Sequence, residues 1–260
     1  NASYVKNEIK NLGNQTGYID KESLPTLGTV SRNENGYPIG YFFGYKAIGV
    51  FQTQEEIDSY ISPATGKPIQ PNAAPGDTKF EDLNGDGVIS DDNEDRTMIG
   101  KPNPDWMVGL TVAADWNGFD LSAFFQGSFG ADVFDALRRY ELAAVNYTSD
   151  ALERWTGPGT SNSMPRIVLG DTPKNFRPST LLVHDASFLR LRNLQVGYTL
   201  PAQLTRKAYI QRLRFYASFD NLLTITGYKG MDPEIGSTMG IDKGVYPQAR
   251  VYTFGLNLTF

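Results

Sequence analysis

Residues 251–260 read VYTFGLNLTF, and this stretch decides the fold class. Every second position carries a large apolar side chain: Tyr252, Phe254, Leu256, Leu258 and Phe260. Smaller or polar side chains fill most of the positions between them. Alternation of this kind is the period of a β-strand, because successive side chains of a strand point to opposite faces. The stretch therefore predicts a strand with one apolar face that ends on an aromatic residue.

The same alternation recurs upstream. It predicts strands at 106–116 and 119–128, separated by Asn117-Gly118, the strongest short signal for a hairpin turn. Further strands are expected at 37–45, 188–200 and 212–220. The apolar phase of 188–200 changes in the middle, which predicts a β-bulge near Arg192 and Asn193.

The links between these strands alternate in length. Asn117-Gly118 and 201–211 are short, whereas 52–105, 130–186 and 227–248 are long. Outer-membrane β-barrels show this alternation, with short periplasmic turns and long extracellular loops. If Asn117-Gly118 is periplasmic, the last strand runs inward and Phe260 lies at the periplasmic face. An antiparallel β-sandwich, whose strands also alternate, remains the alternative fold.

The composition excludes several classes of protein. No run of about 18 apolar residues is present, so a transmembrane helix is excluded, whereas a β-barrel is not. The chain has no cysteine and one histidine, His184, which rules out thiolate metal sites and argues against a Ser-His-Asp triad. A net charge of -5 argues against nucleic-acid binding. The chain starts at Asn1 without a leader pattern, which is typical of a fragment or a processed product.

Several motifs together resemble one family. They lie at residues 40–51 (GYFFGYKAIGVF), 75–77 (PGD), 82–89 (DLNGDGVI), 96–100 (RTMIG), 118–127 (GFDLSAFFQG), 187–198 (SFLRLRNLQVGY), 221–224 (NLLT), 227–228 (GY), 232–234 (DPE), 246–250 (YPQAR) and 252–260. As a set, they are similar to the C-terminal part of SusC/RagA-like TonB-dependent transporters of Bacteroidetes. Each motif is weak by itself, but the set covers nearly the whole chain.

The resemblance implies an all-β fold: about seven antiparallel strands at the C-terminal end of a 22-stranded transmembrane β-barrel in the bacterial outer membrane. The plug domain and the segment that contacts TonB are expected to lie outside this chain. The implied activity is import of glycans or peptides, without enzymatic chemistry, together with a SusD-like surface lipoprotein. The resemblance also implies that Phe260 is a signal for the barrel-assembly machinery. The rival function is that of a soluble, calcium-stabilised, carbohydrate-binding β-sandwich.

The stretch at 82–90 matches the first half of an EF-hand-type calcium loop. Asp82, Asn84 and Asp86 supply oxygen side chains at positions one, three and five, and the Val88 carbonyl falls at position seven. Position twelve is Asn93 instead of a bidentate glutamate, so another carboxylate must complete the shell. The candidates are Asp91, Asp92, Glu94 and Asp95. We predict a structural calcium ion with Asp92 and Asp95 as the further ligands, against the alternative of an acidic turn without an ion.

The other polar and aromatic residues that could form a site are expected mainly to have structural roles. Asp232 and Glu234 could suggest glycoside hydrolysis, but a proline separates them and a loop anchor is the expected role. His184 alone is expected to be a surface or hydrogen-bonded residue. Four arginines on predicted strands are expected to face the barrel interior and pair with acids: Arg190, Arg192, Arg212 and Arg214. Four loop aromatics could stack on a ligand or pack between loops: Tyr140, Tyr147, Trp155 and Phe176.

Overall fold

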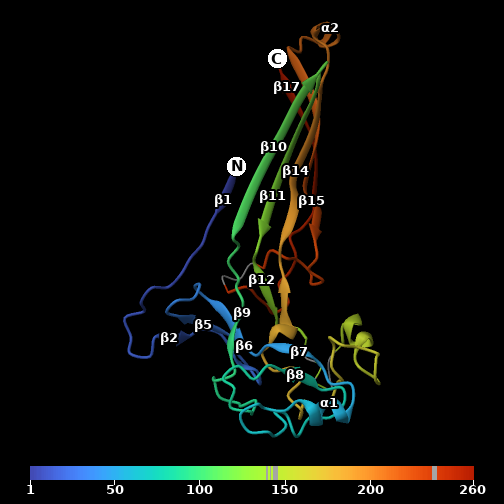
Figure 1. The fold of residues 1–260 in the computed structure, drawn as a ribbon. Coiled ribbons are helices and arrows are strands. Elements are labelled where there is room, and N and C mark those ends of the chain that lie inside the picture. Colours follow the sequence, from blue (N-terminus) through green and yellow to red (C-terminus); the bar gives the residue numbers. More distant parts are fainter. Residues whose placement is uncertain (139, 141, 143–145, 236–238) are drawn as a thin grey trace.

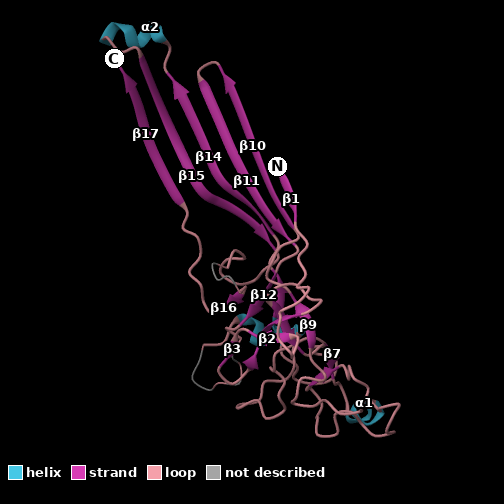
Figure 2. Ribbon diagram, turned by 90° about the vertical axis from the view of Figure 1, so that its left-hand side faces the viewer, coloured by secondary structure: helices cyan, strands magenta, loops and turns pink. Residues whose placement is uncertain are grey.

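A computed structural model describes residues 1–138, 140, 142, 146–235 and 239–260. Its largest element is an antiparallel sheet of six strands, here called the wall, in the order β1-β10-β11-β14-β15-β17 (Figures 1 and 2). The strands are β1 Ala2–Tyr4, β10 Trp106–Trp116, β11 Phe119–Phe129, β14 Phe188–Thr199, β15 Arg212–Thr226 and β17 Val251–Thr259. The predicted all-β, antiparallel fold class is confirmed.

Two features of the wall follow from short sequence signals. Asn117 and Gly118 both have positive φ, 46° and 86°, as the tight turn between β10 and β11 requires. In β14, the register against β11 shifts between Leu191 and Asn193, so Arg192 is the bulged residue. The opposing strand β15 carries Asn221 with φ 53° at the same level, so both strands depart from regular pairing there.

The wall has one apolar and one polar face. In the register, Val112, Ala123, Leu194, Phe219 and Tyr252 form one row across five strands. The neighbouring row on the opposite face is Ala113, Ser122, Gln195, Ser218 and Thr253. Aromatic side chains mark both ends of the apolar face, with Tyr4, Trp106 and Phe129 at one end and Trp116, Phe119, Tyr198 and Phe215 at the other. This arrangement is the alternation and aromatic girdle of a barrel wall.

The apolar face is exposed instead of packed. Trp116 and Phe254 are each 76% exposed, and Leu110 and Leu256 are 58% and 59% exposed. A β-sandwich would cover such a face with a second sheet. The other sheets gather at one end of the wall and leave its apolar face open (Figures 1 and 2). The sandwich alternative is therefore wrong.

The prediction of a wall strand at 37–45 is also wrong. Residues 41–44 form β6 (Tyr41–Gly44), which pairs with β5 (Ser31–Glu34) and β9 (Thr97–Gly100) away from the wall. Tyr41, Phe42 and Phe43 are all buried, so both faces of this strand are packed, and its alternation with glycine does not mark a lipid face. The strand that precedes β10 in the wall is β1, and the link between them runs from residue 5 instead of residue 52.

Three long segments, 5–105, 130–187 and 227–250, meet at one end of the wall, and we call them together the loop lobe (Figure 2). Their strands are β2 Tyr18–Asp20, β3 Ser23–Leu24, β4 Gly28–Thr29, β5, β6, β7 Ala47–Val50, β8 Thr78–Phe80, β9, β12 Asp132–Asp135, β13 Val183–Asp185 and β16 Ile241–Asp242. Their helices are α1 Gln54–Ser59, η1 Ser149–Glu153 and η2 Thr180–Leu182. At the other end of the wall lie the Asn117-Gly118 turn and the link with α2 Ala202–Thr205 and η3 Arg206–Ala208.

The hydrophobic core lies in the loop lobe. Its main cluster joins all three segments, through Phe42 from the first, Phe134 and Leu182 from the second, and Ile241 from the third. Burial of these side chains holds the three segments together, because the apolar surface of each segment is removed from water only when the other two are in place. The loop lobe is thus a folded unit that carries the cavities described below.

Among the described residues, no helix combines the length and the hydrophobicity that a membrane crossing demands.

Candidate functional site: the polar face of the wall and the loop lobe

A network of ion pairs joins β14 to the segment 227–250. Arg190 is buried and donates to Asp232 Oδ1 at 2.5 Å, to Glu234 Oε2 at 3.0 Å and to Thr224 Oγ1 at 2.9 Å. The bulged Arg192 binds both carboxylate oxygens of Glu234 at 2.5 Å. We call these four charged residues the clamp. Because Arg190 shares the polar face with Gln126 and Thr224, the clamp holds the loop on the polar side of the wall.

The Asp232 carboxylate accepts hydrogen bonds from the backbone as well as from Arg190. The backbone donors are the N–H groups of Glu234 and Gln248, at 2.9 and 3.0 Å. Burial acts to raise the pKa of Asp232, but these two N–H groups and the Arg190 guanidinium hold the pKa below its usual value. The carboxylate is therefore ionised at neutral pH and ties both ends of the segment to β14.

Three of the four arginines predicted on wall strands form ion pairs with acids. Arg190 and Arg192 pair with acids as expected, and Arg214 pairs with Asp120 on the polar face at 2.5 Å. Arg212 is exposed. The Asp232 and Glu234 carboxylates are held by arginines, as a loop anchor would be.

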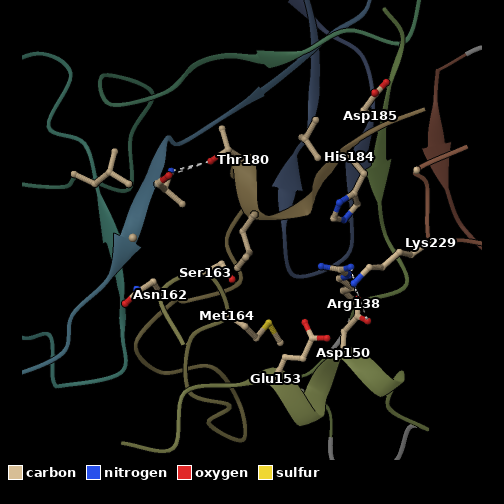
Figure 3. Close-up of a pocket in the computed structure, with 16 residues that line it drawn as sticks. Arg138, Asp150, Glu153, Asn162, Ser163, Met164, Thr180, His184, Asp185 and Lys229 are labelled. Carbon is tan, nitrogen blue, oxygen red and sulfur yellow. Dashed lines mark hydrogen bonds and ion pairs between the residues drawn. The ribbon is translucent and has the colours of Figure 1, made fainter. Parts of the chain in front are cut away.

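A cavity of about 630 Å³ lies in the loop lobe, and Figure 3 shows its lining. Arg138, His184 and Lys229 approach it from three parts of the chain, with Asp150 and Glu153 beside them. The Arg138 guanidinium is neutralised by Asp150 at 2.5 Å and Asp135 at 3.0 Å. Met164, Leu181 and Val183 add apolar surface. The size and the mixed lining suit an organic ligand with polar and apolar parts.

His184 lies at this cavity. Its Nε2 atom is buried and has no hydrogen-bond partner among the described residues. Burial, and then the nearby Arg138 cation, lower the pKa of His184, so the imidazole is neutral at pH 7. No sequence pattern predicts this placement, because His184 lies 46 residues from Arg138 and the two residues meet at the cavity only in the folded chain.

The loop aromatics pack mainly between loops. Tyr140 and Phe176 are buried in one cluster, with ring centroids 5.2 Å apart. Trp155 donates from Nε1 to Gln52 Oε1 at 3.1 Å and lies against Gly76, where a Cβ would be only 2.4 Å from the indole ring. Tyr147 is 44% exposed, and its hydroxyl lies 2.9 Å from the Leu142 carbonyl oxygen and 3.2 Å from that of Tyr140, either of which can accept its proton.

The structure brings the predicted calcium ligands into one loop. The Asp82 carboxylate accepts the N–H groups of Gly85 and Gly87, and Asp86 Oδ1 accepts that of Val88. Asp95 is fully buried and accepts the N–H groups of Leu83 and Ser90, so it closes the loop. The Asp92 carboxylate is engaged by the Ser90 hydroxyl and the Glu94 N–H. Asn84 donates to Asp86 and Glu94.

Within the described part of the chain, no three His, Cys, Asp or Glu side chains converge as a metal site would require. Each Asp82 oxygen nevertheless keeps a free lone pair, and calcium also takes amide and carbonyl oxygens. Calcium binding therefore stays a prediction. We expect a saturable heat of calcium binding by isothermal titration, weakened at least tenfold in Asp86→Ala. Titration heats equal to those of buffer alone would contradict the prediction of a calcium site.

The wall has one exposed apolar face and one polar face, and the loop lobe is folded at one end of it. These features define the class of structure, which is a segment of a β-barrel wall with structured loops at one end. Curated relatives agree. The chain is 34% identical over 236 residues to TonB-dependent receptor P3 of Formosa agariphila and 30% identical over 263 residues to TonB-dependent receptor SusC of Bacteroides thetaiotaomicron. These alignments cover 86% and 100% of the chain but 22% and 24% of the relatives. The chain thus spans about a quarter of the length of the curated relatives it matches.

A solved structure of the RagAB peptide importer in its open-open state matches the whole chain with a TM-score of 0.72 at 26% identity, and the match covers 26% of that structure's chain. No family model matches the chain. The chain is thus similar over most of its length to SusC/RagA-like TonB-dependent transporters, as the sequence motifs indicated. The named relatives are receptors and importers.

Proposed function

We propose that the chain is part of the barrel of an outer-membrane transporter that imports nutrient oligomers, either glycans or peptides, with energy from TonB. The observation that carries the proposal is the exposed apolar face of the wall, with its aromatic ends, in a chain that matches a peptide importer over its whole length. In a bilayer that face would be covered by lipid, which removes the cost of its exposure to water.

The partners follow from the same placement. The polar face of the wall would line the barrel interior, and the lipid bilayer would cover the apolar face. The loop lobe would lie on the extracellular side, where a SusD-like lipoprotein would cap it. TonB would act through a segment outside residues 1–260. Phe260, which is 76% exposed after the end of β17, would be read by the barrel-assembly machinery.

The cavity around His184 is a candidate contact for the imported oligomer. Its neutral imidazole, its paired arginine and its apolar side chains match the mixed surface of a glycan or a peptide and carry no strong charge preference. Substrate class therefore has to be measured with both kinds of oligomer.

The test uses the full-length protein in its own cells. Strains with and without its gene would be given labelled peptides and labelled glycans, and uptake would be measured with and without a protonophore. We expect deletion and the protonophore each to abolish uptake of one of the two classes. Equal uptake of every oligomer by the two strains would contradict the proposal.

A further inference from the structure

A second cavity in the loop lobe, of about 290 Å³, is lined by an unusual group of cations. Arg96, Arg177 and Lys174 line it together with the acids Asp91 and Asp171. It lies between the first and second long segments and is distinct from the cavity around His184, with which it shares no lining residue. Its volume is near the lower end of the range for small-molecule sites, which suits one sugar unit or one amino-acid residue.

Both arginines belong to a ladder in which guanidinium groups alternate with aromatic rings. Arg96 lies 4.3 Å from the ring centre of Phe43, and Arg177 lies 4.7 Å from that of Tyr45. The full order is Tyr18, Arg32, Phe43, Arg96, Tyr45, Arg177 and Phe80. Stacking covers the faces of the guanidinium planes and stabilises their charge, but it leaves the N–H groups at the edges in need of acceptors.

Those edges are incompletely satisfied. Arg96 donates to the backbone carbonyls of Thr29 and Phe43, yet its Nε is buried and has no hydrogen-bond partner among the described residues. Arg177 donates from Nε to the Lys174 carbonyl at 3.2 Å, and its buried NH1 likewise lacks an acceptor. Buried donors of a cationic group are costly to leave unpaired. Both residues line the cavity, so two incompletely paired guanidinium groups stand at its wall, where an anion would compensate their charge.

The cavity already holds a partial substitute for that acceptor. Asp91 Oδ1 is 3.9 Å from Arg177 NH1, which is too far for a hydrogen bond, and the Asp91 carboxylate is bound by Lys174. The Lys174 ammonium lowers the pKa of Asp91, so this carboxylate is ionised. Asp91 and Lys174 are 68% and 50% exposed, so the pair lies at the mouth. Asp171 is engaged elsewhere, because its carboxylate accepts the N–H groups of Asn175 and Phe176.

We propose that this cavity binds a single oxyanion, a carboxylate or a sulfate carried by a small molecule, through Arg96 and Arg177. The anion takes the place next to Arg177 that Asp91 approaches without reaching, and Asp91 competes with it for Lys174. A neutral sugar offers no acceptor of comparable strength, so charge decides the selectivity. The inference concerns binding alone and does not depend on what the whole protein imports.

The test is isothermal titration of the purified full-length protein with inorganic sulfate, glucuronate and glycyl-glutamate, with glucose as the neutral comparison. We expect saturable binding of the anions and none of glucose. A higher affinity for glucuronate than for sulfate would identify a sugar acid as the source of the anion, and a higher affinity for glycyl-glutamate would identify an acidic peptide. The proposal would be overturned if none of the three anions bound saturably.

Variants separate this site from general attraction of anions. Arg177→Gln should weaken anion binding at least about tenfold, because a charge-assisted hydrogen bond is lost. Asp91→Asn should tighten it about two- to fivefold, because an exposed competitor is neutralised. Lys46→Gln, which removes a half-exposed cation of the lobe outside this cavity, should change nothing. Wild-type affinity in Arg177→Gln would contradict the proposal. If that variant does not fold, unchanged affinity in Asp91→Asn would contradict it instead.

Discussion

Arg190→Met should release the segment 227–250 from the wall. The substitution leaves the Asp232 carboxylate buried without its cation, and removing one partner of a buried ion pair costs about 3–5 kcal/mol. Arg190 is only 2% exposed and Asp232 5%, so water does not replace the lost contact in the folded state. Hydrogen exchange of the full-length protein should show the Glu234 and Gln248 amides, which donate to Asp232, exchanging at least about a hundredfold faster.

Arg212→Met is the matched control, because Arg212 is also a wall arginine but is exposed. We expect exchange of the segment to stay at the wild-type rate in that variant. The double variant Arg190→Met/Asp232→Leu should be less disturbed than Arg190→Met alone, because no buried charge is then left unpaired. Equal exchange rates in Arg190→Met and Arg212→Met would show that the clamp does not hold the loop.

Val112→Arg should prevent assembly of the barrel, whereas Ala113→Arg should be tolerated. The two residues are neighbours near the middle of β10, and both are exposed, but they lie on opposite faces of the wall. A charged side chain on the lipid face near the bilayer midplane costs about 2–4 kcal/mol, and one on the interior face does not meet lipid. The measurement is the amount of full-length protein that migrates as a heat-modifiable, folded barrel in the outer-membrane fraction.

The comparison within one strand excludes a general effect of added charge, because both variants add the same arginine. Similar losses in the two variants, or no loss in either, would contradict the assignment of the apolar face to lipid.

The wall was predictable from sequence because its signal is local. Alternation locates β10, β11, β14 and β17, and the phase change locates the bulge at Arg192. For β15 the predicted strand ended at Asp220, whereas the strand continues to Thr226. The reason is that Asn221 falls in the apolar phase and Leu222 in the polar phase, which interrupts the alternation before it resumes in the same phase at Leu223 and Ile225.

The loop lobe was not predictable in the same way. Residues 41–44 carry a strand pattern, but packing on both faces places β6 in the lobe, and alternation alone cannot tell a lipid face from a buried one. The clamp joins Arg190 to Asp232 across 42 residues, and the arginine ladder brings Arg177 of the second long segment against aromatic residues of the first. Such contacts depend on the folded chain. Sequence reasoning found the residue types and the anchoring role of Asp232 and Glu234, but not their partners.

If the wall spans a membrane, its successive residues face lipid and the barrel interior in alternation. Residues 1–260 contain no cysteine. In a cysteine-free version of the full-length protein, a single cysteine can therefore be placed at each position from 107 to 115. Each variant is then spin-labelled and reconstituted in liposomes. We expect the rate of collision between the spin label and oxygen, which partitions into lipid, to peak at 108, 110, 112 and 114 and to fall at the positions between them. Equal accessibility to a water-soluble relaxer along the whole stretch would contradict this expectation.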